Sequence, residues 1–297
     1  MAPPVKVGIN IVPIRPEHTL RYAKHVEDLG FDAIWHGEHV ALSHRSDWWR
    51  EFPGMKELGD KARTEMVPFT PDTNFMDPMA TLAAIAGITS RVRLGIGIYM
   101  LALRDPVLVG RTISTVDLLS NGRLDMAVGL GWTADEYTYT GNNWKTRGKR
   151  MNEIILALRA LFEQERPTFH GEFFHFDDIG FQPKPAQKNP RFPILIGGGG
   201  GPAEVRAAKL GDGWHGHASN IPRIKELLKE YGRENDPFRF SCILFGETPM
   251  EKLEELANQG VETVVVTPWK RGERRADDRG EGAFRLLEDY AKSIGLA

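Results

Sequence analysis

The chain has 297 residues, of which 41% are hydrophobic and 26% charged, enough apolar material for a large folded core. Its formal net charge of −2 argues against binding to the phosphate backbone of nucleic acids. It has no apolar run of the roughly 18 residues that a membrane span needs, and its first residues lack the pattern of a secretory signal. Because Cys242 is the single cysteine, no internal disulfide can form. We therefore expect a cytoplasmic protein that binds neither nucleic acid nor membranes.

Short apolar runs alternate with amphipathic segments along the whole chain. The apolar runs, which predict buried strands, cover residues 5–12, 33–36, 92–99, 124–129, 193–197, 214–217, 238–245 and 263–267. The amphipathic segments, most of which begin near a proline, predict helices over residues 16–29, 78–89, 106–119, 147–162, 202–210, 222–231, 249–259 and 282–294. Eight strand–helix units in strict alternation are typical of an α/β fold, the parallel (β/α)8 TIM barrel.

The predicted barrel forms one domain over residues 1–297, with two insertions. Residues 41–76, after the second strand, are rich in Trp, Pro, Gly and charge. Residues 163–192, before the fifth strand, contain an alternating pattern at about 169–176 that predicts a small hairpin. Long loops of this kind are usually lids or binding elements. The aromatic residues of the first insertion either line a lid over an apolar substrate or anchor the insertion to the barrel; they are Trp48, Trp49 and Phe52.

The ligand site of such a barrel lies at the C-terminal ends of its strands. The residues that the predicted strand ends bring there are Asn10, Pro13, His36, Glu38, His39, Tyr99, Met100, Gly129, Gly131, Trp132, Gly197–Gly201, Trp214, His215, His217, Glu247 and Trp269. The glycine run is followed by Pro202 and a helix, so successive backbone amides predict a phosphate site; the alternative is a flexible turn. The run is not a dinucleotide fingerprint, because no G-x-G-x-x-G with an acidic partner occurs there.

The segment His36-Gly37-Glu38-His39 carries three titratable side chains in four residues. Two histidines and a carboxylate could bind a metal ion, but no other strand end completes the ligand set, so we expect no metal site. His39 is expected to move a proton or contact a ring, because imidazole titrates near neutrality. The alternative is a hydrogen-bonded structural histidine at the mouth of the barrel.

Two other features leave alternatives open. Gly95 and Gly97 of the third strand leave room either for a flat ligand close to the backbone or for tight packing in the barrel. One of His215 and His217 faces either the ligand or a loop. The charged tract at residues 271–281 is typical of a solvated loop, although its arginines could reach an anionic ligand.

Four stretches carry a family resemblance: GFDAIWHGEHV at residues 30–40, the stretch from LGIGIYM to VGLGW at 94–132, HGEFFHFDDIGFQPKPAQ at 170–187, and FPILIGGGGGPAEVRAAKLGDGW at 192–214. They resemble the bacterial luciferase-like monooxygenase superfamily, and especially its branch of oxidoreductases that depend on the deazaflavin coenzyme F420. The resemblance runs over nearly the full length, with several motifs in the same order. MLALRDP at residues 100–106 departs from the family, where many relatives have a proline and a histidine before the final proline. That difference bears on the choice of substrate.

The resemblance implies a barrel that binds a flavin or deazaflavin in an extended pose, with its ring over the third strand. The family usually has a bulge there with a non-prolyl cis peptide, which by position falls near Tyr99 or Met100. The resemblance also places the cofactor phosphate at the glycine run and makes Glu38 and His39 the catalytic residues near the reactive edge of the ring. The expected cofactor contacts are Asn10, His39, Gly97, Tyr99, Met100, Gly129, Gly131, Trp132, Gly197, Gly198, Gly199, Gly200 and Gly201.

The resemblance implies an oxidoreductase that transfers a hydride between F420 and a small organic substrate, with His39 or a neighbour handling the proton. The alternative is an FMN-dependent monooxygenase that uses reduced flavin and O2 with a separate reductase. A catalytically silent flavin-binding barrel is a third possibility. A phosphate-ligand isomerase or aldolase would need a lysine at a strand end, for which Lys270 is the candidate. Relatives often form homodimers, so we expect one here.

Overall fold

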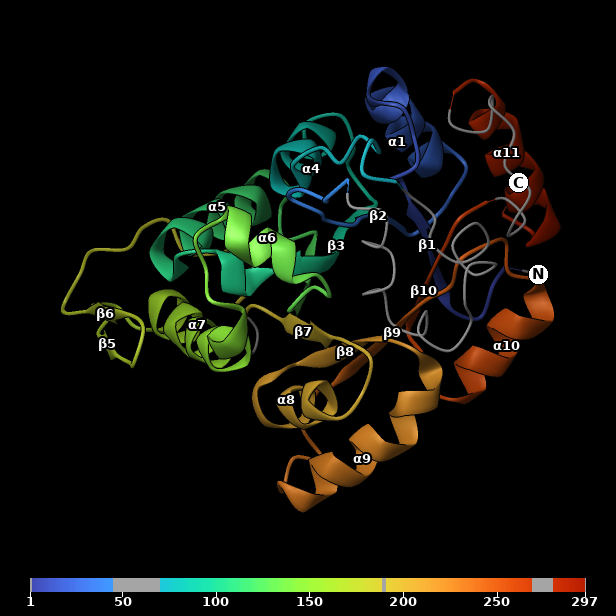
Figure 1. Cartoon of the computed structure of the whole chain (residues 1–297). Helices are drawn as coiled ribbons and strands as arrows, with labels where there is room; N and C mark the ends of the chain where they lie inside the picture. The colour runs from blue at the N-terminus through green and yellow to red at the C-terminus, as the bar shows by residue number, and fades with distance from the viewer. Residues whose placement is uncertain (1, 45–69, 189–190, 269–279, 297) are drawn as a thin grey trace.

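A computed structural model describes residues 2–44, 70–188, 191–268 and 280–296 of the chain. Within them, eight parallel strands close a barrel in the order β1-β10-β9-β8-β7-β4-β3-β2 (Figure 1). The barrel strands are β1 (Lys6–Asn10), β2 (Ala33–His36), β3 (Arg93–Met100), β4 (Leu124–Gly129), β7 (Ile194–Gly197), β8 (Gly213–Gly216), β9 (Arg239–Ile243) and β10 (Thr263–Val266). The predicted parallel (β/α)8 barrel is therefore confirmed.

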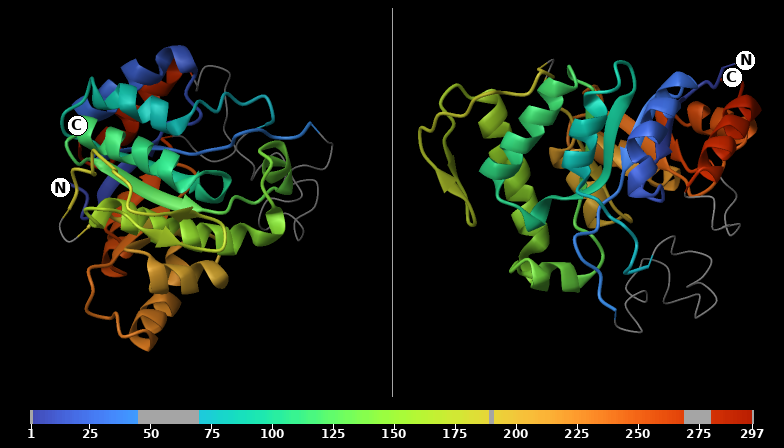
Figure 2. Two further views of the ribbon diagram at one scale, coloured as in Figure 1. Left: turned by 90° about the vertical axis from the view of Figure 1, so that its left-hand side faces the viewer. Right: turned by 90° about the horizontal axis from the view of Figure 1, so that it is seen from above.

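Helices connect successive strands and cover the outside of the barrel (Figures 1 and 2). They are α1 (Thr19–Asp28), α4 (Pro78–Ala86), α5 (Pro106–Leu119), α6 (Ala134–Tyr139), α7 (Arg147–Glu163), α8 (Pro202–Leu210), α9 (Ile221–Glu230), α10 (Met250–Asn258) and α11 (Gly282–Ser293). Local signals set their starts: the carboxylate of Asp77 accepts from the N–H of Ala80, and that of Asp105 from the N–H of Val107. Helix α6 lies in a segment that the sequence pattern predicts as a loop. Among the described residues, no helix has the length and apolar character that a membrane crossing requires.

The hydrophobic core has two parts. The larger cluster includes apolar residues of the helices and of the outward-facing side of the strands, among them Tyr22, Leu158 and Trp214. A smaller cluster takes its residues from β2, β4, β7 and β10, around the barrel, so these side chains meet inside it. The members of the inner cluster are Ala33, Trp35, Ala127, Leu195 and Val265, with the partly buried Ile98 and Ile243 packed against them.

A charged network closes the N-terminal end of the barrel. The buried carboxylate of Asp125 accepts two hydrogen bonds of 2.7 Å from Arg93 and one of 2.7 Å from Arg239. Arg239 also reaches Glu262 at 3.1 Å, and Glu262 pairs with Lys6 at 2.7 Å. Burial alone would raise the pKa of Asp125, but the two guanidinium groups outweigh it and hold that pKa at about 2. Asp125 therefore joins strands β3, β4 and β9, and Glu262, directly before β10, extends the network from β9 to β1.

The predicted hairpin is present between α7 and β7. Strands β5 (Phe169–His170) and β6 (His175–Phe176) pair antiparallel, with Phe169 opposite Phe176 and His170 opposite His175. Both views place the hairpin beyond α7, at the edge of the molecule (Figures 1 and 2). Most of the insertion predicted at residues 41–76 lies outside the described residues.

Candidate functional site

The C-terminal end of β3 departs from regular strand pairing. Its pairing with β4 shifts register between Gly97 and Tyr99, and the Gly97–Ile98 peptide bond is cis. The bulge expected in this strand is present. The non-prolyl cis bond expected near Tyr99 or Met100 is also present, and it lies between Gly97 and Ile98, directly before the Tyr99 at which β3 resumes its pairing.

Two aromatic rings fill the barrel beneath the bulge. The indole of Trp35 stacks on the imidazole of His215, with ring centroids 4.5 Å apart and planes 5° from parallel. A Cβ atom on Gly95 would overlap the indole, and one on Gly97 would lie 2.5 Å from Nε2 of His215. Of the two predicted alternatives for these glycines, tight packing therefore describes the structure, since the protein's own rings occupy the space beside them.

His215 is buried and carries an unusual pKa. Its Nδ1 lies 3.0 Å from the hydroxyl of Ser241. Nothing in the described parts of the chain offers a hydrogen bond to its Nε2 or to Nε1 of Trp35, although both atoms are buried. Burial lowers the pKa of His215 to about 4, so the imidazole is neutral at pH 7. Of the two alternatives for His215, the loop position is wrong, because the residue belongs to β8 and its imidazole faces the barrel interior. Contact with a ligand stays a prediction.

Trp214 also differs from the prediction. Strand β8 begins at Gly213, one residue earlier than the predicted strand, and side chains alternate along it. Because His215 points inward, Trp214 points outward, where it is completely buried in the outer cluster. It does not line the mouth.

Ile98, at the bulge, covers the ends of two neighbouring strands. A Cβ atom on Gly129 or on Gly197 would overlap the Ile98 side chain. Both glycines are therefore required by Ile98 itself, and not only by an approaching ligand. Ile98 and Ile243 are partly exposed and pack on the inner cluster, so they form an apolar floor at the C-terminal end of the barrel.

His39 forms a buried pair with Glu136 at this end. Its Nδ1 lies 3.1 Å from the Glu136 carboxylate, whose other oxygen accepts from the backbone N–H of Val40 at 2.6 Å. The imidazole also packs edge-on against Phe75 and Trp132, with centroids 5.0 and 5.3 Å away. When Nδ1 carries a proton, the carboxylate accepts its hydrogen bond, and Nε2 is then the nitrogen at which the ring exchanges a second proton.

Glu38 holds the end of β3. Its buried carboxylate accepts from the N–H of Met100 at 2.8 Å and from Arg104, whose Nη1 lies 3.0 Å away. The Arg104 guanidinium in turn stacks over the Tyr99 ring, 3.8 Å from its centroid. Burial raises the pKa of Glu38 above its ordinary value, and Arg104 opposes that rise. Consecutive residues thus fix two strand ends: Glu38 binds the end of β3, and His39 binds the segment after β4.

The glycine run forms a strained turn into α8. Gly200 and Gly201 have φ values of +110° and +55°, which favour glycine. The N–H of Gly201 donates to Glu204 at 3.0 Å, and Asn220 donates to the same carboxylate at 2.6 Å. Within the described chain, the N–H groups of Gly199 and Gly200 make no hydrogen bond. These two amides are the donors that an anionic ligand would find.

The other predicted residues have local roles or lie elsewhere. The side-chain oxygen of Asn10 accepts from the N–H of Val12 at 3.1 Å, which turns the chain after β1. Gly131 has a φ of +70°, and a Cβ atom there would lie 2.6 Å from Sδ of Met100. His36 is buried, and burial lowers its pKa. The predicted residues that fall outside the described chain are Trp48, Trp49, Phe52, Trp269 and Lys270.

Sequence reasoning missed Glu136. The segment Thr133-Ala134-Asp135-Glu136 matches the S/T-x-x-E signature of a helix capping box. Thr133 does cap α6, accepting from the N–H of Asp135 at 3.3 Å. The Glu136 carboxylate, however, binds His39 and the backbone of Val40 instead of returning to the cap. The signature could have located the short helix, but not the histidine that its glutamate binds.

A surface groove of about 380 Å³ lies between α1 and α11, away from these residues. It is lined by Arg21, Lys24, His25, Asp28, Glu281, Phe284 and Glu288. All are residues of the outer helices or the segment before α11, and none belongs to a strand end. The groove is therefore separate from the candidate site at the mouth.

The chain resembles known proteins over most of its length. The sequence profile of the family described as luciferase-like monooxygenase matches residues 4–265. An uncharacterised protein of Mycobacterium tuberculosis is 36% identical over 232 residues, which are 74% of this chain and 79% of that protein. The F420-dependent glucose-6-phosphate dehydrogenase of Amycolatopsis mediterranei is 27% identical over 203 residues, 67% of this chain and 53% of that protein.

Two solved structures share the fold. An F420-dependent secondary alcohol dehydrogenase, in complex with an F420–acetone adduct, has a TM-score of 0.73 at 16% identity and covers 100% of this chain and 99% of that one. The oxygenating constituent of the 3,6-diketocamphane monooxygenase of Pseudomonas putida, in complex with FMN, has a TM-score of 0.69 at 13% identity, covering 99% of this chain and 98% of that one.

Proposed function

Because the chain belongs to the luciferase-like monooxygenase family, we propose that it is an oxidoreductase that transfers a hydride between coenzyme F420 and a small organic substrate. The names of two similar proteins support the choice of F420: a glucose-6-phosphate dehydrogenase related in sequence and a secondary alcohol dehydrogenase related in fold. Both are dehydrogenases, so oxidation of an alcohol or the reverse reduction is the reaction class we favour.

The His39–Glu136 pair is the observation that carries the proposal. Oxidation of an alcohol releases a proton from the hydroxyl group as the hydride leaves carbon, and a positioned base accelerates that step. The imidazole of His39 can accept the proton at Nε2, because Glu136 holds the proton on Nδ1. The imidazolium that results faces a fully buried carboxylate, which stabilises its charge. In the reductive direction the same pair donates the proton.

Bound F420 would supply a carbon centre that exchanges a hydride with substrate. In this chain, the apolar floor of Ile98 and Ile243 fits one face of a flat ring. The N–H groups of Gly199 and Gly200 would bind the cofactor phosphate. The Glu204 carboxylate already binds the N–H of Gly201, so it limits the phosphate to the amides before it.

The alternative is an FMN-dependent monooxygenase that uses reduced flavin and O2. The family description and the FMN-bound structural relative favour it, and the same floor and amides would suit a flavin mononucleotide. The reaction of a reduced flavin with O2 also takes up a proton, so the His39 variants test the proton-transfer pair in either function, and the choice of cofactor separates the two.

Titration of the protein with oxidised F420 and, in parallel, with FMN tests the cofactor. Tryptophan fluorescence reports binding, because Trp132 packs against His39 at the mouth. We expect tighter binding of F420 and a smaller quenching signal in Trp132→Phe. Tighter binding of FMN would replace the proposal by the monooxygenase, and binding of neither would remove both.

Paired variants test the proton-transfer role. We expect His39→Asn to lower kcat for hydride transfer by about 10²- to 10⁴-fold, the usual contribution of a general acid or base, and Glu136→Gln to lower it less. F420 binding should change little in either variant. His25→Asn is the control, since His25 pairs with Glu288 on the outer helices. Unchanged turnover in His39→Asn would contradict the role.

We also infer a cytoplasmic homodimer whose cofactor is recycled by a separate reductase. Exposed apolar side chains on the outer helices support a contact between copies, since apolar surface of this kind is often buried in an interface. On α5, Leu108 is 72% and Leu119 60% exposed, and on the neighbouring α7, Leu156 is 47% exposed. Light scattering after size-exclusion chromatography measures the oligomeric state. A monomer at micromolar concentration would contradict this part of the proposal.

A further inference from the structure

The hairpin of β5 and β6 carries three possible metal ligands on one face. His170 and His175 are directly opposite each other in the antiparallel pair. Asp177 follows His175 by two residues, and alternate residues of an extended chain point to the same side. The spacing H-x4-H-x-D therefore gathers two imidazoles and one carboxylate, while Phe169 and Phe176 pack together with ring centroids 5.9 Å apart.

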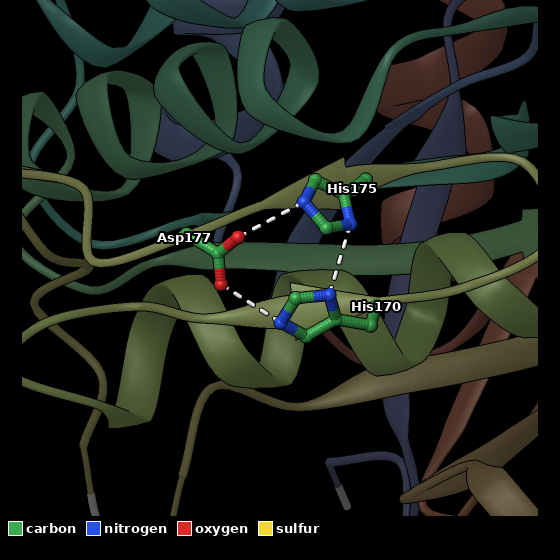
Figure 3. A group of neighbouring side chains, drawn as sticks. All are labelled: His170, His175 and Asp177. Carbon is green, nitrogen blue, oxygen red and sulfur yellow. Dashed lines mark hydrogen bonds and ion pairs between the residues drawn. The ribbon is translucent and has the colours of Figure 1, made fainter.

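The three side chains lie against one another (Figure 3). Nδ1 of His170 is 2.9 Å from Nδ1 of His175. The two carboxylate oxygens of Asp177 reach the two Nε2 atoms, at 2.8 Å from His170 and 2.9 Å from His175. One ligand atom from each residue can be chosen so that all three lie within 4.8 Å of one another. The side chains are 56–62% exposed, so an ion can reach them from solvent.

The backbone beneath these side chains is held by α7. The carboxylate of Glu153 accepts from the N–H groups of Glu172, Phe173 and Phe174, at 2.9, 2.8 and 2.6 Å. The Arg150 guanidinium stacks over the Phe174 ring, 4.4 Å from its centroid. A ligand set on an anchored turn needs little ordering when an ion binds, which favours binding.

We propose that His170, His175 and Asp177 bind a divalent transition-metal ion of the zinc class. Two imidazole nitrogens and one carboxylate oxygen are a ligand set that Zn²⁺ accepts, at bonds of about 2.0–2.2 Å, with water completing the coordination. Bonds of that length place tetrahedral ligand atoms about 3.3 Å apart. That spacing lies between the contacts of 2.8–2.9 Å that these side chains make and the 4.8 Å within which one ligand atom of each residue lies, so modest side-chain rotations bring the three atoms to it. The sequence argument against a metal site considered only the ligands at the strand ends of the barrel. The proposed site lies in the hairpin, outside that set.

The ion would join both strands of the hairpin to the segment that follows β6. This clamp is at the edge of the molecule, beyond α7, and is remote from the barrel mouth (Figure 1). The site is therefore structural and independent of the proposed redox activity. If the hairpin binds no metal ion, the cofactor proposal is unaffected. If the chain binds no F420, the metal-site proposal is unaffected.

Competition between the tag-free protein and a chromophoric chelator for Zn²⁺ tests the proposal. We expect one equivalent of ion per chain, and binding at least about tenfold weaker in His170→Ala, His175→Ala and Asp177→Asn. Asp178→Asn is the matched control, because Asp178 is the neighbouring carboxylate and pairs with Arg166 instead. It should bind as the unaltered chain does.

Cobalt substitution gives a second readout. Co²⁺ in a site with nitrogen and oxygen ligands of low coordination number absorbs visible light, and we expect that band to disappear in the His170→Ala, His175→Ala double variant. Circular dichroism checks that these surface variants fold. Absence of stoichiometric binding by the unaltered chain, or equal binding by all variants, would overturn the site and leave the three residues as a solvent-exposed ion pair.

Discussion

At the N-terminal end of the barrel, the buried carboxylate of Asp125 accepts hydrogen bonds from Arg93 and Arg239. Toward the C-terminal end, Nε2 of His215 and Nε1 of Trp35 are buried, and no described residue bonds to them. The first arrangement satisfies a charge, whereas the second leaves two polar atoms unsatisfied, at a cost to stability. The N-terminal end of the barrel therefore pairs its buried polar groups, whereas the interior toward the C-terminal end accepts two unpaired ones within the described residues.

Removing the charge of Asp125 tests whether the network stabilises the N-terminal end of the barrel. Of the changes considered, it should lower the free energy of unfolding the most. The fall of its pKa from the ordinary value near 4 to about 2 corresponds to roughly 2–3 kcal/mol. Asp125→Asn also leaves the partly buried Arg93 and Arg239 without their shared partner, so we expect a loss of about 3 kcal/mol or more. Urea unfolding at pH 7 measures it.

The sign of the pH dependence follows from the lowered pKa. The contribution of Asp125 is fully present above about pH 4, the unfolded value, and is lost as the pH falls toward about 2. Asp28→Asn is the control, because Asp28 is an exposed carboxylate paired with Lys24 and should cost less than about 1 kcal/mol. Equal losses in the two variants would show that the network does not stabilise the N-terminal end.

Lowering the pH tests the interior toward the C-terminal end of the barrel, where His215 is buried. His215 has a pKa of about 4 in the folded chain, whereas an unfolded histidine titrates near 6.5. The unfolded chain therefore binds the proton first, so the free energy of unfolding should fall by about 3 kcal/mol between pH 6.5 and pH 4. His215→Phe keeps a ring beside Trp35 and cannot titrate. We expect its stability to fall less over this range, and an identical pH dependence would contradict the assignment.

The fold could be predicted because its signals are local. Apolar runs mark the strands, and Asp77 and Asp105 mark helix starts through side chains that cap amides two or three residues away. The site could be predicted only as a set of strand ends. The contact between His39 and Glu136 spans 97 residues, and nothing in either local pattern specifies the partner. A pattern can place a residue at a strand end, but packing decides its neighbours.

The inward or outward direction of a strand residue is equally hard to predict. A shift of one residue in the start of β8 exchanges the positions of Trp214 and His215 between the outer cluster and the barrel interior. Similarly, the family resemblance makes Gly129 and Gly197 cofactor contacts, and in the structure the protein's own Ile98 takes the space beside both. A glycine in a strand indicates that another group lies close to the backbone, but the sequence does not identify that group.

The contact of Ile98 with Gly129 and Gly197 provides the smallest of the expected effects on stability. A methyl group in Gly129→Ala would overlap the Ile98 side chain, so we expect a loss of about 1–3 kcal/mol from overpacking at the mouth. In an Ile98→Ala background the overlap is absent, and the same substitution should cost much less. The coupling between the two sites, measured by urea unfolding of both single variants and the double variant, should be about 1 kcal/mol or more.

Gly87→Ala is the control for this cycle, because a Cβ atom at Gly87 would have an ordinary contact of 3.5 Å and the residue has a φ of −72°. It should be neutral or slightly stabilising. Displacement of Ile98 in Gly129→Ala should also weaken cofactor binding, since the floor on which the ring rests would move. Additive stabilities together with unchanged cofactor affinity would mean that Ile98 neither requires the glycines nor shapes the site.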